Sequence, residues 1–141
     1  MAVTDSDDGQ DDPVAADGAR LAALMLGSGV VHLLAPQLYE PAVPRWAGDP
    51  RRVVLVSGVA ELACGALLLV PGTRRLGGWA TAALLVGVLP ANVQMVLDAG
   101  TERQAMPTVP AGLYRAACLA RLPLQVPLVR RALRIARAGR A

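Results

Sequence analysis

The stretch from residue 53 to residue 70 constrains this chain most, because it is predominantly apolar yet carries one ionisable residue, Glu61, at its midpoint. A helix that crosses a membrane needs about 20 mainly apolar residues, and this stretch is close to that length. A charged side chain at the bilayer centre costs roughly 2.5–3.5 kcal/mol even on insertion-based scales. We therefore expect a transmembrane helix in which Glu61 is protonated, paired or turned toward a polar cavity inside a bundle.

The composition of the whole chain favours the same environment. Hydrophobic residues make up 54% of the sequence and charged residues 18%, and the mean hydropathy is +0.42. A soluble domain of this length would be short of polar surface. The net charge is +3, but no stretch combines aromatic and basic residues as nucleic-acid-binding surfaces do. We expect the lipid bilayer, and no nucleic acid, to be a partner of the chain.

The two cysteines, Cys64 and Cys118, lie in apolar runs and lack the spacing of metal ligands. We predict no metal site and no covalently bound cofactor. Their expected depths in the membrane differ by roughly 9 Å, which exceeds the ~7 Å limit on the Cα separation in a disulfide. Each cysteine is therefore expected to be a buried packing thiol.

Four apolar runs predict an all-α, integral membrane four-helix bundle. The predicted spans are residues 19–35, 53–70, 76–97 and 113–130. The turn at residues 71–75 is short enough only for an antiparallel helical hairpin. Within the third span, Pro90 should kink the helix and free a carbonyl near Asn92 and Gln94.

The segments outside the spans are polar or rich in proline. Residues 1–18 are acidic and predict a disordered tail, and residues 36–52 and 98–112 predict loops. Residues 130–141 carry five arginines and predict a basic helix extension at an anionic membrane surface, ending in a cytoplasmic tail at 135–141. Because arginines are in excess on the side that holds both termini, the positive-inside rule predicts that both termini are cytoplasmic.

Each predicted span contributes polar residues at a similar depth, and we expect them to share one intramembrane pocket. These residues are His32, Glu61, Asn92, Gln94, Arg121 and Gln125. Glu61 and Arg121 have opposite charges and are the expected ion pair. Two interpretations stay open: a functional pocket, or polar bonds that only hold the helices together, worth about 0.6 kcal/mol each on average. Ser57, Gly58 and Gly65 are expected to permit close helix packing.

Short motifs in the same order along the chain resemble the DoxX-like family of small four-helix membrane proteins. They are Gly29-Val30-Val31-His32, Ser57-Gly58-Val59-Ala60-Glu61, Pro71-Gly72-Thr73-Arg74-Arg75, Pro90-Ala91-Asn92-Val93-Gln94-Met95 and Arg121-Leu122-Pro123-Leu124-Gln125. The resemblance spans residues 19–134. It implies a bundle of the bacterial inner membrane and, for some relatives, a subunit of a quinone-linked sulfur-oxidising enzyme or of a complex that handles thiol stress. This chain lacks the Cys-x-x-Cys pair of a dithiol shuttle.

Two functional hypotheses follow. In the first, the chain is a membrane subunit or accessory of a quinone- or thiol-linked redox system, and a partner subunit supplies the redox centre. Arg121 and Asn92 would bond a quinone carbonyl, while Glu61 or His32 would handle protons. In the alternative, the chain is a non-enzymatic membrane assembly or chaperone-like protein whose polar residues are structural. Whether the chain has catalytic activity of its own stays open at this point.

Overall fold

The computed structural model describes residues 12–99 and 110–138, and this part of the chain is helical without any strand. The predicted all-α class is confirmed. The long helices are α1 (Pro13–Leu34), α2 (Pro50–Leu69), α3 (Arg74–Gly87), α4 (Leu89–Asp98) and α5 (Ala111–Arg137). Three 3₁₀ turns lie between α1 and α2: η1 (Pro36–Leu38), η2 (Glu40–Ala42) and η3 (Arg45–Ala47).

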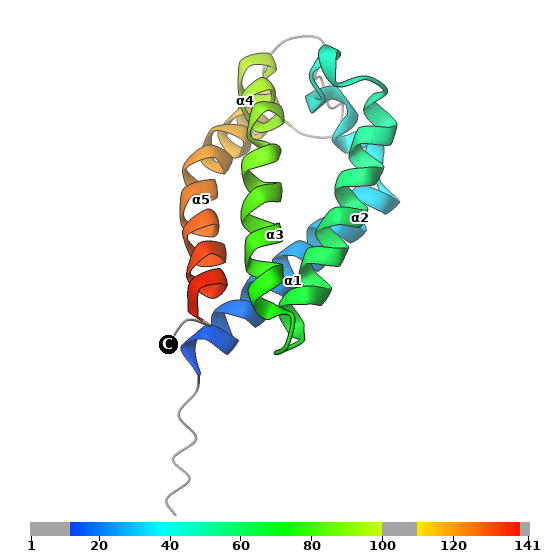
Figure 1. Cartoon of the computed structure of the whole chain (residues 1–141). Helices are drawn as coiled ribbons and strands as arrows, with labels where there is room; N and C mark the ends of the chain where they lie inside the picture. Colours follow the sequence, from blue (N-terminus) through cyan, green and yellow to red (C-terminus); the bar gives the residue numbers. More distant parts are fainter. Residues whose placement is uncertain (1–11, 100–109, 139–141) are drawn as a thin grey trace, which may run out of the picture.

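The helices run alternately up and down in an antiparallel bundle, with α4 continuing the direction of α3 (Figure 1). Around the bundle, α1 packs against α2, α2 against α3, α3 against α5, and α5 against α1. The start of α1 and the end of α5 lie together, at what we name the terminal end (Figure 1). The 3₁₀ turns and the end of α4 lie at the opposite end, which we name the loop end.

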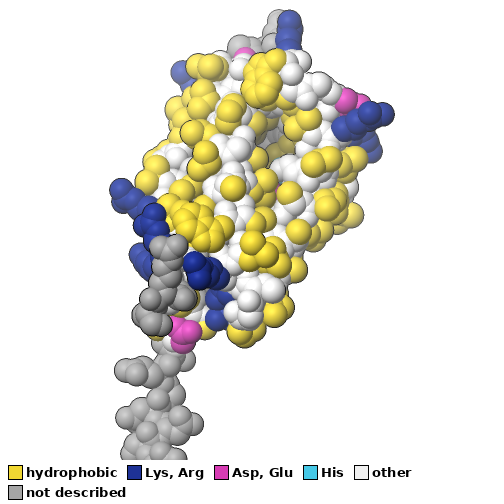
Figure 2. Space-filling model, in the orientation of Figure 1, with side chains coloured by type: hydrophobic (Ala, Val, Ile, Leu, Met, Phe, Trp, Pro, Cys, Tyr) yellow, Lys and Arg dark blue, Asp and Glu magenta, His cyan; other side chains and the backbone are white. Residues whose placement is uncertain are grey.

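Three helical segments are long and apolar enough to cross a membrane: Pro13–Leu34, Pro50–Leu69 and Arg74–Asp98. The fourth predicted span falls in α5, which has 27 residues and therefore a length of about 40 Å, but α5 is not among these three segments. Figure 2 shows hydrophobic side chains over the middle of the bundle, with arginines gathered toward its two ends.

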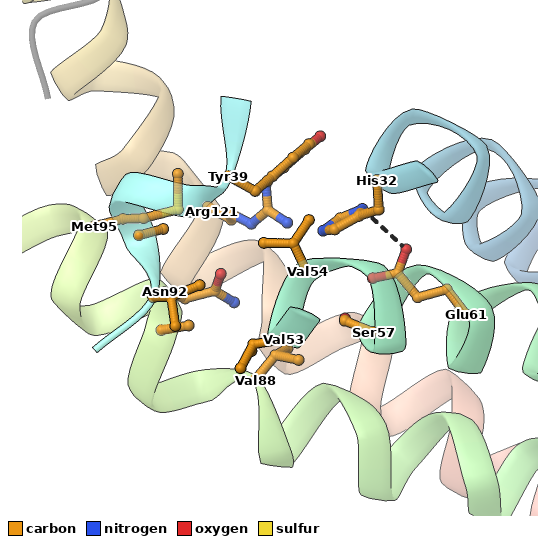
Figure 3. A pocket seen from close by; sticks show the side chains of 13 residues that line it. His32, Tyr39, Val53, Val54, Ser57, Glu61, Val88, Asn92, Met95 and Arg121 are labelled. Carbon is orange, nitrogen blue, oxygen red and sulfur yellow. Dashed lines mark ion pairs between the residues drawn. The ribbon is translucent and has the colours of Figure 1, made fainter. Parts of the chain in front are cut away.

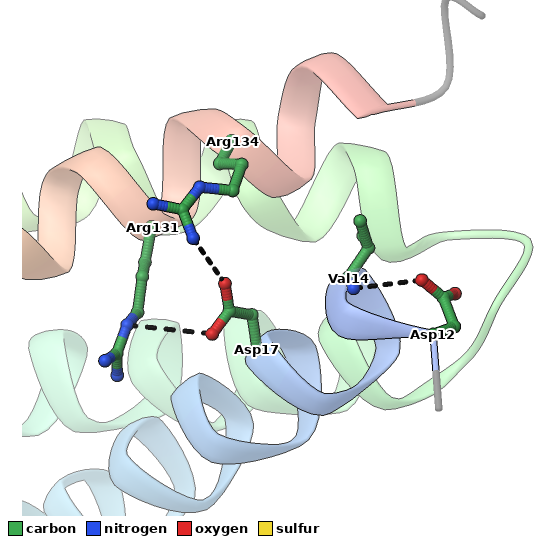
Figure 4. Close-up of polar contacts among 5 residues, drawn as sticks. All are labelled: Asp12, Val14, Asp17, Arg131 and Arg134. Carbon is green, nitrogen blue, oxygen red and sulfur yellow. Dashed lines mark hydrogen bonds and ion pairs between the residues drawn. The ribbon is translucent and has the colours of Figure 1, made fainter. Parts of the chain in front are cut away.

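The first helix starts earlier than predicted, because residues 13–18 are helical and not part of a disordered tail. Pro13 occupies the first turn, where its missing N–H costs nothing, and Asp12 caps the helix by accepting a 2.9 Å hydrogen bond from the backbone N–H of Val14. The carboxylate of Asp17 then holds the helix to α5 through Arg134 (2.9 Å) and Arg131 (3.7 Å) (Figure 4). The remainder of the predicted tail, residues 1–11, lies outside the described residues.

The predicted basic extension of the last helix is present, since α5 continues to Arg137. Its residues Ala132, Ile135 and Ala136 are buried in the bundle, so the extension packs against the other helices, which was not predicted. The contact is close: a Cβ added to Gly78 of α3 would lie 2.7 Å from the backbone nitrogen of Ala136. Small residues on both helices allow this approach, which the arginines around them concealed in the sequence.

The predicted interruption of the third span is confirmed. Helix α3 ends at Gly87 and α4 begins at Leu89, with Pro90 in the first turn of α4. Because proline has no N–H, the helical hydrogen-bond ladder is broken here. At this break the carbonyl of Leu85 accepts a hydrogen bond from the side-chain amide of Gln125 on α5.

Two separate clusters form the core. The larger one, toward the terminal end, combines α1, α2, α3 and α5 and includes the fully buried Leu21 and Leu68. The smaller one, toward the loop end, contains Met95, Cys118 and two alanines. Cys64 belongs to the first cluster and Cys118 to the second, and both are free and buried. The prediction that they do not bridge is confirmed.

Candidate functional site

A cavity of about 80 Å³ lies in the loop-end half of the bundle, between the α3–α4 break and the facing helices (Figure 3). Its wall is apolar apart from six side chains, which are His32, Tyr39, Ser57, Glu61, Asn92 and Arg121. Pockets that enclose whole drug-sized ligands are typically about 300–1,000 Å³. This cavity therefore suits a small polar group, or one end of a longer molecule.

The buried side of the cavity is formed by a His32–Glu61 pair. The Nδ1 atom of His32 lies 3.4 Å from Oε2 of Glu61, and both side chains are less than 10% exposed. The same Nδ1 lies 2.8 Å from the backbone carbonyl oxygen of Ser28. A carbonyl oxygen only accepts hydrogen bonds, so Nδ1 carries a proton and donates this hydrogen bond to the backbone carbonyl of Ser28.

This arrangement leaves one oxygen of Glu61 without a hydrogen bond and one nitrogen of His32 on the cavity side of the ring. Although Oε2 of Glu61 is within ion-pair distance of His32, it is buried and accepts no hydrogen bond from the described residues. The second ring nitrogen of His32, Nε2, lies on the side of the ring that faces Val54 and Arg121 (Figure 3). A buried polar atom without a partner costs roughly 1–3 kcal/mol, which a bound hydrogen-bonding group would recover.

Close packing of α1 on α2 brings the pair together. A Cβ added to Gly58 would lie 2.8 Å from the Cβ of His32, and one added to Gly29 would lie 2.8 Å from the carbonyl oxygen of Gly58. The two helices therefore approach backbone to backbone at the level of the cavity. The predicted packing role of Gly58 and Gly65 is confirmed, since a Cβ at Gly65 would also clash, at 2.6 Å from Leu26.

Two side chains complete the mouth of the cavity. Tyr39, between η1 and η2, stacks on the imidazole of His32 with ring centroids 3.9 Å apart and planes inclined by 17°. Arg121 reaches in from α5, and its guanidinium group points toward the space between Tyr39 and Val54 (Figure 3). The cavity thus has an acid–histidine pair on one wall and a permanent cation on another.

Behind the cavity, Asn92 and Gln125 connect α4 to α5. The side-chain Nδ2 of Asn92 donates a 3.0 Å hydrogen bond to Oε1 of Gln125, whose Nε2 donates to the carbonyl oxygen of Leu85. Asn92 and Gln125 are both more than 90% buried. This chain of bonds satisfies the carbonyl at the helix break and fixes Asn92 at the cavity wall.

Of the six polar residues that the sequence singled out, the structure places four at the cavity, which are His32, Glu61, Asn92 and Arg121. Gln125 lies one layer behind them. Gln94 does not line the cavity, because its Nε2 donates a 2.9 Å hydrogen bond to Asp98 one helical turn away. Its side chain thus leaves the α4 face that carries Asn92.

The predicted ion pair between Glu61 and Arg121 is wrong. Glu61 pairs with His32, and Arg121 forms no ion pair within the described residues. The reason is the order of the helices around the bundle, in which α1 packs directly on α2 while α5 packs on α1 and α3. The similar positions of these residues within their apolar runs indicated that they share a level of the bundle, but not which of them touch.

Two cavity residues were not predicted as part of the site. Ser57 lies one helical turn before Glu61, so the i, i+4 spacing on one helix face was a signal for it. Tyr39 lies in the segment at residues 36–52, which was predicted only as a loop. Its stacking on His32 depends on how the turns after Pro36 fold back over α1, and no local pattern indicates that.

The chemistry open to these groups is proton transfer and hydrogen bonding. Ser28 and Glu61 both approach the same nitrogen of His32, with Ser28 Oγ at 3.4 Å from Nδ1. A catalytic triad needs the serine and the acid on opposite ring nitrogens, so this is no activated serine nucleophile. Within the described part of the chain, no cluster of three or more His, Cys, Asp or Glu side chains has the arrangement of a metal site.

Comparison with known proteins gives one match. A family model described as a domain of unknown function (DUF8561) matches residues 21–136, which include all five long helices in whole or in part. No curated protein and no solved structure matches the chain.

Proposed function

The chain belongs to the family described as a domain of unknown function (DUF8561), and we propose that it is an integral membrane protein whose cavity binds the head group of a quinone. The cavity serves a redox system in which a partner subunit supplies the electrons. The proposal has four parts, which concern the membrane, the orientation in it, the ligand and the partner subunit.

The membrane claim is supported by what the helices expose. Large apolar side chains face outward from every long helix, where a soluble protein would carry polar ones. On α2, for example, Val56 is 69% and Val59 57% exposed, and on α5 Leu124 is 59% exposed. The outward face of α5 is therefore suited to lipid even though its arginines lower its overall hydropathy. We propose that four helical segments cross the bilayer, namely α1, α2, α3 together with α4, and α5.

The orientation claim is that the terminal end is cytoplasmic, which follows from the excess of arginine there. Reporter fusions after Val70 and after Arg137 should both indicate the cytoplasm, and a fusion after Asp98 should indicate the opposite side. A cytoplasmic signal after Asp98 would contradict the four-span topology. The resemblance to the DoxX-like family adds the proposal that the membrane is the bacterial inner membrane.

The proposed ligand is supported above all by Glu61, whose buried Oε2 accepts no hydrogen bond from the described residues, and by its neighbour His32 in a small, mostly apolar cavity. The apolar wall suits one face of a flat ring, and the volume of about 80 Å³ would admit one polar edge of that ring, with the rest of the molecule extending into lipid. The Arg121 guanidinium is a donor for a carbonyl oxygen or for the oxyanion that forms on it. His32 holds a proton at Nδ1 and presents Nε2 to the ligand, where it can pass a proton to or from a second oxygen.

In the proposed redox system, this chain binds the quinone and a partner subunit supplies the electrons. Reduction of a quinone to a quinol adds electrons and protons to both carbonyl oxygens. This chain would orient the ring and move the protons through His32 and Glu61, and the partner subunit would deliver the electrons. Such a role needs no redox centre in the chain itself.

A second function is favoured by a different observation. Asn92, Gln125 and the Leu85 carbonyl satisfy one another without any ligand, as bonds that only hold helices together would. On this view the chain is a membrane assembly protein, and its outer surface binds a larger partner. Copurification of a stable partner that persists in Glu61→Gln, without any response to quinones, would favour this function.

Thermal unfolding of the purified protein in mild detergent tests the ligand claim. A short-chain quinone at about 100 times its Kd should stabilise the protein by about 2.7 kcal/mol, and so raise Tm by roughly 5–10 °C. Arg121→Gln should reduce this rise, whereas Arg115→Gln, which removes an exposed arginine of the same helix outside the cavity, should not. Each variant is compared with its own Tm without quinone. Equal shifts in both variants, or none in the native chain, would contradict the proposal.

A further inference from the structure

A second hollow lies at the terminal end, far from the cavity. It is open, has a volume of about 460 Å³, and is lined by Arg130, Arg134 and Arg137 together with Leu133 and Ala138. An α-helix turns by about 100° per residue, which places these three arginines within an arc of about 60° on one face of α5. Their guanidinium groups therefore surround a common space, with an apolar wall beside them.

Within the described residues, two of these three arginines form no ion pair. Arg134 donates a 2.9 Å hydrogen bond to the carboxylate of Asp17, and Arg131 approaches the same carboxylate at 3.7 Å (Figure 4). Among residues 12–99 and 110–138, Arg130 and Arg137 form no ion pair. The carboxylate of Asp17 is thus shared by Arg131 and Arg134. The other two arginines of the hollow, Arg130 and Arg137, are not balanced by an acidic side chain of the described residues.

Basic side chains outnumber acidic ones over the whole terminal end. In the described part of the chain, this end carries two acidic side chains, Asp12 and Asp17. It carries seven basic ones, which are Arg20, Arg74, Arg75, Arg130, Arg131, Arg134 and Arg137. Arg74 further uses its Nε to donate a 3.1 Å hydrogen bond to the carbonyl of Leu68, so it is partly engaged with the α2–α3 turn. The hollow on α5 is where the charge without an ion pair meets an apolar wall.

We propose that this hollow binds the phosphate of an anionic phospholipid, with an acyl chain lying along Leu133. The planar guanidinium group forms two parallel hydrogen bonds with a phosphate, which an ammonium group cannot do. The apolar wall distinguishes a lipid from a free anion, because a free phosphate gains nothing from Leu133. The inference rests on the membrane part of the proposed function and is independent of the cavity and its ligand.

The occupied site has a structural consequence. A phosphate held by Arg130 and Arg137 would reduce the repulsion between these two side chains and Arg134. Arg134 is the residue that links α5 to Asp17 of α1. The lipid should therefore stabilise the contact between the first and last helices. The bound lipid would thus hold α1 and α5 together at the terminal end of the bundle.

Delipidated protein in a neutral detergent provides the test. Dioleoylphosphatidylglycerol is added in one series, dioleoylphosphatidylcholine in a second and inorganic phosphate in a third, and both Tm and lipid retained after gel filtration are measured. Each arginine near an anionic surface changes lipid affinity about five-fold, so Arg130→Gln/Arg137→Gln should bind phosphatidylglycerol roughly thirty-fold more weakly. Arg45→Gln/Arg115→Gln removes the same charge at the loop end and should bind it as the native chain does.

The outcomes separate the site from the membrane claim. A Tm rise and retention specific to phosphatidylglycerol, reduced in Arg130→Gln/Arg137→Gln and intermediate in Arg130→Lys/Arg137→Lys, supports the site. Equal effects of phosphatidylcholine overturn the site while leaving membrane insertion in place. Equal protection by inorganic phosphate overturns the lipid as its occupant. If neither lipid is retained and the reporter fusions also fail, membrane insertion itself is wrong.

Discussion

The contact between α1 and α2 at Gly58 gives the sharpest test of the site's geometry. In the substitution Gly58→Ala, the new Cβ would meet the Cβ of His32 at 2.8 Å and the carbonyl oxygen of Gly29 at 3.1 Å. Neither neighbour is the far end of a flexible side chain. Ordinary contact begins at 3.4 Å, so the two helices must separate by about 0.6 Å at the level of the cavity.

The magnitude follows from two opposing terms. Overpacking of a tight contact typically costs about 1–3 kcal/mol. Replacing a helical glycine by alanine gains up to about 1 kcal/mol from helix propensity. Gly58→Ala should therefore destabilise the protein by about 0–2 kcal/mol. Gly27 is the matched control, since it is also in the α1–α2 pair but a Cβ there meets nothing within 4 Å. Gly27→Ala should gain the propensity term alone.

Thermal unfolding of both variants by circular dichroism in the same detergent measures the difference. The contact term of about 1–3 kcal/mol should lower Tm of Gly58→Ala by roughly 2–12 °C relative to Gly27→Ala. Because the shift moves His32 away from Glu61, Gly58→Ala should also weaken the response to quinone, whereas Gly27→Ala should leave it unchanged. If the two variants were equally stable, the backbone approach that positions the pair would be refuted.

Three further predictions concern the rest of the bundle. Asp17→Asn should destabilise the protein by roughly 1 kcal/mol, since its two arginine partners are partly exposed, and the loss should shrink at high salt, as salt titration during thermal unfolding will measure. Gln125→Leu leaves buried partners unsatisfied and should cost about 1–3 kcal/mol in unfolding measurements, with part of the loss recovered when Asn92→Leu is added. A variant with both Cys64→Ala and Cys118→Ala should keep the full quinone-induced rise in Tm, because neither thiol lines the cavity.

The parts of the fold that sequence predicted well depend on local physics. Apolar runs of the right length predicted the helices, and Pro90 predicted the break between α3 and α4. The early start of α1 was also readable, since Asp12 before Pro13 is a helix-start signal. It was outweighed by the acidic composition of the segment, whose Asp17 is neutralised by arginines more than a hundred positions away.

The parts that were mispredicted depend on the order of helices around the bundle. The position of a residue within its apolar run predicts its level along the bundle, and for Glu61, Arg121 and His32 the predicted levels were similar. It does not give the direction in which a side chain points around its helix, nor which helices are neighbours. The choice of His32 over Arg121 as the partner of Glu61 is decided by the glycine contact between α1 and α2.

The same physics explains why the cavity is where it is. Toward the terminal end, small residues such as Gly65, Gly78 and Ala136 let the helices close on one another, and the large core cluster fills the space between them. Toward the loop end, Pro90 interrupts the segment formed by α3 and α4, and Pro123 lies inside α5. Because prolines disturb regular helix packing, the second core cluster is small. A bundle that was tight along its whole length would have no room for a ligand. One that was loose throughout would have no fixed frame on which to hold His32 and Glu61 in register.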